Sequence, residues 1–596
     1  MRALRFTELC CFICLCIGVA ATSYGQIPER RLSNWSGVGA QDYYSFETEH
    51  RTTSSELGLD PNGVEDSHAA LQNYISAHAG EGVEIFLEAG SYRLSQTLQL
   101  TSKLRLIGAG AEQTELLLDL QGQGHGLFAQ GQIAPTTFPL SAPALRGSTQ
   151  VLSTAASEVC GMEWLLLTDD DEEKVTSNWA LGSTAQMVRI EDCRGDTIFL
   201  SDPLRRNFYP NRQASVRVMD PLRQIEITQL GLKREDDADQ QWSNIRFDGV
   251  TDSRISCLSS QYCYFSHIEL LRSSRVSIEE CRFDDALDHG GGGRGYGVVL
   301  HFSTGQCLVM HNHFNRLRHS LLLQAGANGN VLAYNFSENP YWTDVSLPAN
   351  SAGDLVLHGN YPYANLMEGN IVQNAVIDAS HGINGPGNTF FRNRMELYGL
   401  FIDPTTPTDS LIFVGNEVTN RFFIYGLWLD SGTGHFQYGN RIKGDLRPNS
   451  EAQIDTTSLF LSAPPELYAS DAWPLIGPPR VENENINWPE EVRDLSAESL
   501  CLVGSTSLPT LPLAKQAALF APNPCRGMLH FVPEGLETQL STTSAVEIYH
   551  SSGKLQYRGL IRQGDGISTH HWPTGVYFAI IQKDKTLLTQ TLLRLE

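Results

Sequence analysis

The chain contains histidine, acidic and arginine residues whose spacing could bring them together as a catalytic group. The six candidates are Arg318, His319, Asp354, His358, Asp378 and His381. His358 and His381 each lie 12 residues before an asparagine of a regular series, so we expect their imidazoles to meet on adjacent turns of a repeating structure. Two imidazoles in contact repel each other when both are charged. At least one should therefore have a low pKa or a carboxylate partner, unless the pair is stacked for structural reasons alone.

Two reactions are open to these side chains. β-Elimination of a uronate polymer needs a cation to neutralise the substrate carboxylate and a base to remove the C5 proton. Arg318 would supply the cation. No lysine occurs between Lys233 and Lys443, which leaves Arg318, a histidine (His358 or His381) or Tyr361 as the base, and we expect a neutral histidine in that role. Hydrolysis would instead need an acid and a second carboxylate, for which Asp354 and Asp378 are the best pair.

Two long insertions are expected to flank the candidate residues. Segments 285–297 and 338–353 both begin shortly after a position of the asparagine series, so they should leave the same corner of the fold, two turns apart. The residues that we expect to bind substrate are Asp288, His289, Tyr341, Trp342, Asp344, Tyr361, Arg392 and Arg394. The alternative is that Tyr341 and Trp342 fold back on their own loop, and that at least one of the two arginines is an outer, solvated residue.

The asparagine series predicts the element that must position this chemistry. Its members are Asn312, Asn335, Asn370, Asn393, Asn416 and Asn440. Successive members are separated by 23, 35, 23, 23 and 24 residues, so one period holds apart from a single long step. This pattern predicts a solenoid with one coil per period. Stacked coils lie about 4.8 Å apart, so each amide can donate to the next and form a structural ladder.

The segment before the repeats carries the pattern of a known family. The matching residues are Asp60, Gly63, Val64, Asp66, Ala70, Leu71, Gln72, Gly90, Tyr92, Gly108 and Gly110. In these residues the chain resembles the pectate-lyase-like superfamily of right-handed parallel β-helices. The resemblance implies an all-β solenoid with a long groove for an extended polysaccharide, and calcium as a possible cofactor. It leaves the reaction open, because the superfamily includes lyases, hydrolases, epimerases and non-enzymatic surface proteins.

Composition shifts divide the chain into six parts. We expect a signal peptide (1–25), an N-terminal cap with the first coils (26–146), a β-rich insertion (147–221), the β-helix with the candidate groove (222–462), a proline-rich tail or linker (463–515) and a C-terminal module (516–596). The insertion contains the acidic run 169–173, which we interpret as a solvated loop or a cation site.

The C-terminal part resembles the sorting domain of the bacterial type IX secretion system. The resemblance rests on the motif Asn523-Pro524-Cys525-Arg526-Gly527, on segment 546–554 and on Gly575-Val576-Tyr577. It implies a small β-sandwich module, a Bacteroidota-type cell, the type IX secretion machinery as a partner, and a location outside the cell or on its outer surface.

Composition limits the partners further. The chain has 596 residues and a net charge of −24, from 43 basic and 67 acidic residues, which argues against a nucleic-acid partner. No stretch after the signal is apolar enough to span a bilayer, and we expect a monomer. Export permits disulfides; Cys257 and Cys281, 24 residues apart, could stack on neighbouring coils or remain free thiols.

We therefore predict a secreted or surface-attached enzyme that cleaves an extended, acidic polysaccharide by elimination or hydrolysis. The alternative is a non-catalytic β-helix that binds glycan or serves in adhesion.

Overall fold

The computed structural model describes most of the chain up to residue 464 and the strands of the C-terminal module. The described residues are 27–41, 46–238, 240–343, 346–405, 408–448, 452–464, 473, 476–479, 520–521, 528–531, 544–550, 555–561, 566–568, 575–583 and 586–594. The predicted signal peptide, most of the 463–515 segment, the 523–527 motif and Asp344 lie outside them.

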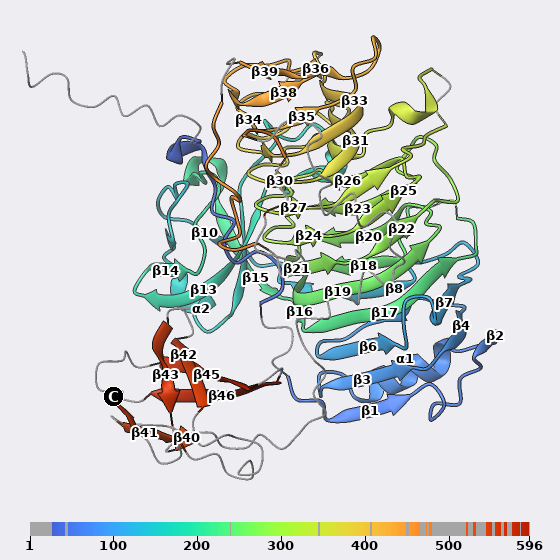
Figure 1. Ribbon diagram of the computed structural model, residues 1–596, viewed down its shortest axis with the longest axis vertical. Helices are drawn as coiled ribbons and strands as arrows, with labels where there is room; N and C mark the ends of the chain where they lie inside the picture. The colour runs from blue at the N-terminus through green and yellow to red at the C-terminus, as the bar shows by residue number, and fades with distance from the viewer. Residues whose placement is uncertain are drawn as a thin grey trace, which may run out of the picture. The chain divides into compact units, whose positions relative to one another are not determined.

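The main body is a right-handed parallel β-helix, which confirms the fold expected from the repeat (Figure 1). Successive coils stack strand on strand in three parallel faces, which we call A, B and C. Face A comprises β1 (His50–Thr53), β3 (Val83–Leu87), β6 (Leu104–Gly108), the first half of β17 (Ile225–Arg234), the middle of β19 (Val250–Gln261), β21 (Ser274–Glu279), β24 (Leu308–Met310), β27 (Val331–Ala333), β30 (Leu366–Glu368), β32 (Thr389–Phe391), β34 (Ile412–Val414) and β37 (Phe436–Tyr438).

Face B follows face A in each coil. It comprises β2 (Asn62–Asp66), β4 (Gly90–Leu94), β7 (Thr114–Leu118), the ends of β17 and β19, β22 (Arg282–Asp284), β25 (His313–Asn315), β28 (Phe336–Glu338), the starts of β31 (Ile371–Ile377) and β33 (Arg394–Ile402), β35 (Glu417–Val418) and β38 (Asn440–Ile442). The hairpin partner β39 (Asp445–Arg447) ends this face with an antiparallel pairing.

Face C positions the candidate site. It comprises β5 (Leu98–Gln99), β8 (Leu127–Gln130), β18 (Ile245–Asp248), β20 (Ser266–Leu271), β23 (Tyr296–His301), β26 (His319–Leu323), β29 (Leu355–Leu357), the ends of β31 and β33, and β36 (Leu427–Leu429). Outside the three faces, β16 (Leu222–Arg223) pairs with the start of β19, and helix α1 (His68–Ala77) covers the first coils.

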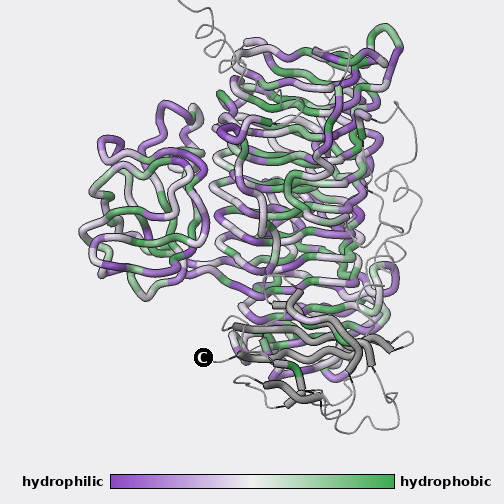
Figure 2. The backbone as a smooth tube through the Cα atoms, turned by 60° about the vertical axis from the view of Figure 1, so that its left-hand side comes forward, coloured by the Kyte–Doolittle hydropathy of each residue, from purple (hydrophilic) through white to green (hydrophobic). Residues whose placement is uncertain are grey.

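The interior of the solenoid is apolar because alternate residues of each short strand point inward. Hydrophobic residues recur at matching positions of successive coils, as Figure 2 shows. Identical rings also stack between neighbouring coils: Phe283 with Phe314, and Phe390 with Phe413, each with centroids 5.1 Å apart. The core therefore repeats coil by coil and leaves outward side chains free to vary.

The asparagine ladder lies at the corner between faces A and B. Asn370 is typical: its side-chain nitrogen donates to Asn393 Oδ1 (2.9 Å) and to the Leu332 carbonyl (2.8 Å), and its oxygen accepts from Asn335. A second ladder of Asn330, Asn365 and Asn388 runs five residues earlier in each coil. It was not predicted, although its members repeat the same 35- and 23-residue steps.

The β-rich insertion forms its own antiparallel sheet beside the coils (Figure 2). Its strands are β9 (Gln132–Ile133), β10 (Phe138–Pro139), β11 (Gln150–Leu152), β12 (Trp164–Thr168), β13 (Gln186–Arg194), β14 (Thr197–Leu200) and β15 (Ser215–Asp220), with the short helices α2 (Ala156–Val159), η2 (Asn178–Ala180) and η3 (Pro210–Arg212). The sheet thus begins about 15 residues before the expected boundary at 147. A disulfide joins Cys160 to Cys193, whereas Cys281 is a buried free thiol.

The acidic run of the insertion is solvated only in part, since Asp170, Glu172 and Glu173 are exposed and the other two carboxylates are not. Asp169 is buried and binds the Arg206 guanidinium, and Asp171 is buried and accepts hydrogen bonds from the main-chain N–H groups of Gly182 and Thr184. These internal partners also occupy the carboxylates that a cation would need.

The C-terminal unit contains two antiparallel sheets. One pairs β40 (Phe520–Ala521), β41 (Met528–Phe531) and β44 (Gly566–Ser568); the other has the order β43 (Leu555–Ile561), β42 (Ser544–His550), β45 (Gly575–Lys583), β46 (Thr586–Arg594). None of the described helices has the length and apolar character that a bilayer crossing would need.

Candidate active site

A cleft of about 590 Å³ lies over face C, and its floor is polar. The floor residues that matter here are Arg246, Glu269, His301, Gln324, His358 and His381. One wall is Trp179 from the insertion, whose ring contacts His381 and Phe302 at centroid distances of 5.3 and 5.7 Å. Gly292 and Gly293 from the 285–297 loop also line the cleft. The insertion is fixed in place because Ser303 Oγ donates to the Ser183 carbonyl at 2.7 Å.

One end of the cleft holds a row of imidazoles. His358 Nδ1 lies 2.6 Å from Asp378 Oδ2, so its Nδ1 proton points to the carboxylate and its Nε2 is left for other chemistry. The His358 ring lies 5.0 Å from that of His381 and 5.7 Å from that of His319. Arg318 completes this end, with its guanidinium over the Tyr296 ring.

The charge of this end is set by burial and by the Asp378 carboxylate. Burial, Arg318 and His358 together lower the pKa of His319 to about 3. Burial and the neighbouring His358 also lower the pKa of His381. Burial would raise the pKa of Asp378, but the hydrogen bonds from His358 and Ser380 outweigh it and hold that pKa at about 2. His319 and His381 are therefore neutral at pH 7, and Asp378 is ionised.

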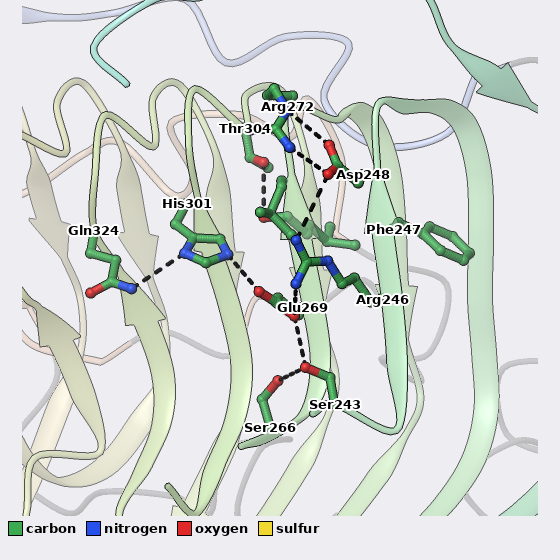
Figure 3. A network of polar contacts seen from close by, with 12 residues as sticks. Ser243, Arg246, Phe247, Asp248, Ser266, Glu269, Arg272, His301, Thr304 and Gln324 are labelled. Carbon is green, nitrogen blue, oxygen red and sulfur yellow. Dashed lines mark hydrogen bonds and ion pairs between the residues drawn. The ribbon is translucent and has the colours of Figure 1, made fainter. Parts of the chain in front are cut away.

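The other end of the cleft contains a polar network that the sequence did not reveal to us (Figure 3). Glu269 accepts hydrogen bonds from His301 Nε2 (3.0 Å) and Ser243 Oγ (2.8 Å), and Arg246 lies 3.5 Å from its second oxygen. Gln324 Nε2 donates to His301 Nδ1 at 3.3 Å. Burial would raise the pKa of Glu269, but His301 and Arg246 outweigh it and lower that pKa. This carboxylate is ionised and fully engaged.

A second carboxylate belongs to the same network. Asp248 binds the Arg272 guanidinium through both oxygens, with Nε at 2.8 Å from Oδ1, and lies 3.8 Å from Arg246. Arg246 thus bridges Asp248 and Glu269 on neighbouring strands.

Asp354 does not belong to the cleft, contrary to prediction. It is fully buried and accepts hydrogen bonds from Ser337 Oγ and from the main-chain N–H groups of Gln373 and Asn374. The strand register pairs Leu355 with Ala375, so Asp354 lies beside Asn374 and not beside Asp378. The proposed Asp354–Asp378 hydrolytic pair is therefore absent.

The two predicted loops do meet. The Thr343 N–H donates to the His289 carbonyl, and the His289 and Tyr341 rings contact at 5.0 Å. Trp342 lies 5.9 Å from the Arg318 guanidinium, which places this aromatic residue at the imidazole end. Asp288 pairs with Arg294 of its own loop and has no contact with the cleft floor.

Three other residues predicted to bind substrate lie elsewhere. Arg392 is buried and donates to the carbonyls of Ile454, Ile476 and other tail residues. Arg394 is buried against Glu417 at 3.2 Å. Neither arginine is solvated or accessible to a polymer, and Tyr361 lines a different pocket.

The cleft residues that the sequence analysis did not predict have the same spacing from the ladder as those that it did predict. Arg246, Glu269, His301, Gln324, His358 and His381 all lie 11 or 12 residues before the ladder position of their coil, counted from Cys257 and Cys281 for the first two. We used this offset for His358 and His381 only. Extending it toward the N-terminus would have identified the whole floor of the cleft.

Comparisons with known proteins agree with the architecture. Residues 53–269 match the family described as rhamnogalacturonase A/epimerase, pectate lyase-like, and no curated protein matches the chain. The tailspike protein gp49 from Pseudomonas phage LKA1 aligns at 12% identity and a TM-score of 0.48, covering 62% of this chain and 64% of the tailspike. This chain thus spans less than two thirds of that tailspike.

Two further solved structures are similar to this chain at lower TM-scores. The mannuronan C-5 epimerase AlgE4 A-module from Azotobacter vinelandii aligns at 11% identity and a TM-score of 0.29, covering 66% of this chain and 92% of the module. PfbA, a surface adhesin of Streptococcus pneumoniae, aligns at 10% identity and a TM-score of 0.35, covering 68% and 82%. The chain is therefore a right-handed parallel β-helix protein, and its residues 53–269 are similar to a pectate-lyase-like family.

Proposed function

We propose that the protein cleaves an acidic polysaccharide by β-elimination in the cleft over face C. The observation that carries this proposal is the His358–Asp378 pair at 2.6 Å beside Arg318 and two neutral imidazoles. Arg318 would bind the uronate carboxylate: its Nε–H is buried without a hydrogen-bond partner, and its guanidinium donates once, to the Gly290 carbonyl. A cation with unused donors suits a planar carboxylate.

His358 would act as the base. Its Nδ1–H is held by Asp378, so Nε2 presents a lone pair and can accept the C5 proton of the substrate. The electron pair of the broken C5–H bond forms the C4–C5 double bond, the C4–O bond breaks with its electron pair on oxygen, and this leaving oxygen takes a proton from solvent water. Asp378 stabilises the imidazolium that results, because an ionised carboxylate at this distance favours the charged ring.

Hydrolysis is less well supported, because it requires two carboxyl groups about 5 to 9.5 Å apart with one of them protonated. Glu269 and Asp378 lie on strands separated by four steps of face C, or about 19 Å at normal strand spacing. Glu269 and Asp248 lie closer to each other, but neither is available as an acid. The pKa of Glu269 is lowered, and Asp248 is bound by the Arg272 guanidinium.

The proposed elimination does not rely on calcium, an ion that takes 6 to 8 oxygen ligands, typically including several carboxylates. Glu269 and Asp378 are far apart, and each is bound to an imidazole. Among the described residues, the one group of three metal-type ligands is His50, His78 and Glu81, near the first coils.

The test is a paired assay on the full chain with a panel of acidic and neutral polysaccharides, with and without calcium. Ultraviolet absorbance of unsaturated ends should rise together with reducing ends. His358→Ala should lower kcat by about 100-fold to 10 000-fold, as expected for loss of a general base. His78→Ala, a histidine outside the cleft, is the control and should leave kcat unchanged.

Three other results would contradict the proposal. Reducing ends without absorbance would establish hydrolysis. Binding without either product would favour the glycan-binding or adhesion alternative. Full activity in His358→Ala, with a normal melting temperature, would remove this histidine from the reaction.

We also propose that the protein is exported and sorted by the type IX secretion system. Support comes from the sequence motifs at 523–527, 546–554 and 575–577 and from the antiparallel strands described within 520–594. A reporter protein carrying residues 1–25 and 516–596 should leave a Bacteroidota cell, and a reporter without the C-terminal part should stay in the periplasm. Equal export of both reporters would refute this assignment.

A further inference from the structure

A second pocket, separate from the cleft, lies between the insertion and the solenoid. Its volume is about 400 Å³, and it shares no lining residue with the cleft. The insertion contributes Lys174, Arg205, Arg206 and Tyr209, and the solenoid contributes Tyr361. Neither element alone builds this pocket, so it exists only when the two are docked.

The pocket carries an excess of positive charge. Its lining contains five cations, Arg146, Lys174, Arg205, Arg206 and Arg212, against two carboxylates, Asp169 and Glu173. Asp169 neutralises Arg206 and Glu173 neutralises Arg212. Three positive charges therefore remain within the lining, in a chain whose net charge is −24. Asp202, outside the lining, attracts Arg205 but is already paired with Arg275.

The remaining cations have neutral or shared partners. Arg205 is buried and donates to Asn328 Oδ1 at 2.9 Å, and Arg146 donates to main-chain carbonyls, of which Leu32 is nearest at 2.8 Å. Lys174, whose side chain is 20% exposed, lies 3.9 Å from Asp169, which is already bound by Arg206. Across the described part of the chain, no carboxylate forms an ion pair with Arg146 or Arg205.

Such an arrangement is costly unless an anion enters it, because each partly desolvated cation loses hydration and repels the others. Burial and the neighbouring Arg206 accordingly lower the pKa of Lys174, and burial lowers the pKa of Arg205. The other walls are aromatic or apolar: Tyr209, Tyr361, Ala364 and Pro386. Rings beside cations suit a ligand that has both a sugar face and a negative group.

We infer that this pocket binds an anionic sugar residue, bearing a carboxylate or a sulfate, at a site distinct from the cleft. The inference stands on the charge and lining of the pocket and does not depend on what the cleft does to a polymer. A polymer held here and in the cleft at once would gain affinity from two attachment points.

The experiment measures binding by isothermal titration with trigalacturonate and with a sulfated disaccharide. The full chain carries His358→Ala, so that the ligand is not consumed. At least one of the two ligands should bind, and the added change Lys174→Gln should weaken that binding about tenfold, the loss expected for one charge-assisted contact. Lys174→Arg should keep most of the affinity, and Lys233→Gln, a lysine on the solenoid away from the pocket, should keep all of it.

Controls separate the inference from general anion binding and from misfolding. Neutral maltotriose and inorganic sulfate should each bind at least tenfold more weakly than the charged saccharide. Equal affinity in Lys174→Gln and its parent, or equal affinity for sulfate or maltotriose, would overturn the inference. Melting temperatures of all variants show whether they are folded. Failure of the cleavage assay leaves this result intact, since titration records binding and not turnover.

Discussion

Replacing Asp354 by asparagine tests whether this carboxylate is structural or catalytic. Asp354 is 0% exposed, and its two oxygens accept hydrogen bonds from Ser337 Oγ at 2.8 Å and from the N–H groups of Gln373 and Asn374 at 2.9 Å. Burial is the dominant effect and raises its pKa from 3.8 to about 7, although the three hydrogen bonds oppose it. The folded protein therefore prefers the protonated form.

The sign of the pH dependence follows from this shift. Below pH 3.8 the carboxyl of Asp354 is protonated in both the folded and the unfolded chain, and the contribution of this group to the free energy of unfolding is fully present. As the pH rises toward about 7, the unfolded chain releases the proton and the folded chain keeps it, so this contribution is lost. A shift of about three pKa units corresponds to a loss on the order of 4 kcal/mol by pH 8.

Asparagine can reproduce the three hydrogen bonds of the protonated carboxyl, but the second hydrogen of its amide nitrogen has no acceptor among these partners. Its amide oxygen can accept from both N–H groups, and its amide nitrogen can donate to Ser337 Oγ. Ser337 can then donate to Ser320 Oγ, which lies 2.8 Å away with either atom as donor. Asp354→Asn should therefore be less stable than the wild-type protein by about 1 to 3 kcal/mol near pH 4, because of the unpaired amide hydrogen, and should become the more stable of the two by pH 8.

The assay is denaturant unfolding of both proteins at pH 4 and pH 8, combined with the cleavage assay at pH 8. The exposed Asp445→Asn is the control and should show no pH-dependent gain. A variant less stable than the wild-type protein at pH 8 would refute the burial argument. A stable variant without activity would refute our removal of Asp354 from the catalytic group.

Three further predictions concern the ladder, the insertion and the cleft wall. Asn370→Ala removes four buried hydrogen bonds of 2.8 to 3.0 Å and should cost about 3 to 5 kcal/mol of unfolding free energy. The exposed Asn211→Ala is the control and should change it by less than about 0.5 kcal/mol. Changing Cys160 and Cys193 to serine opens a 33-residue loop and should destabilise the insertion by about 3 to 4 kcal/mol, measured by calorimetry with reduced wild-type protein as comparison. Trp179→Ala should raise KM several-fold with little change in kcat, because this ring covers His381 and does not contact the His358–Asp378 pair; a selective fall in kcat would contradict that placement.

The fold could be predicted from the sequence because the corner between faces A and B repeats from coil to coil and needs the same hydrogen-bond donor each time. Asparagine at Asn312, Asn335 and Asn370 satisfies buried carbonyls that no apolar residue could satisfy, so its spacing records the length of each coil. The insertion boundary was less visible, since β9 and β10 are strands of two residues and carry no periodic pattern.

The register near the site could not be obtained by counting from the ladder. The pairing of β29 with β31 sets Leu357 opposite Ile377, which lie 13 and 16 residues before Asn370 and Asn393, so residues with equal offsets from the ladder are not strand partners here. Consequently His358 lies opposite Asp378 in the strands, and His381 reaches it from the following turn. The contact between the two imidazoles was predicted, but the strand pairing that brings the two residues together was not.

The roles of the arginines depended on partners far away in sequence. The main-chain carbonyls that bind Arg392 belong to Ile454 and Ile476, more than 60 residues later. Arg205 similarly meets Asn328 across 123 positions. No local pattern can reveal such contacts, which is why Arg392 was assigned to substrate and the cationic pocket was not anticipated.

Within one coil, the residue that stabilises the fold and the residue proposed for catalysis make different contacts, and their independence can be measured. Asn370 and His358 belong to the same coil, but Asn370 bonds only to ladder neighbours and to the Leu332 carbonyl, whereas His358 contacts Asp378 and the adjacent rings. Because the two residues share no partner, their effects on unfolding free energy should add within about 0.5 kcal/mol in the double variant. Asn370→Ala should leave kcat near the wild-type value below its melting temperature, and His358→Ala should leave the melting temperature nearly unchanged. A coupling of more than about 1 kcal/mol would show that the ladder and the cleft are energetically coupled. Outward residues of this solenoid could then not change independently of its core.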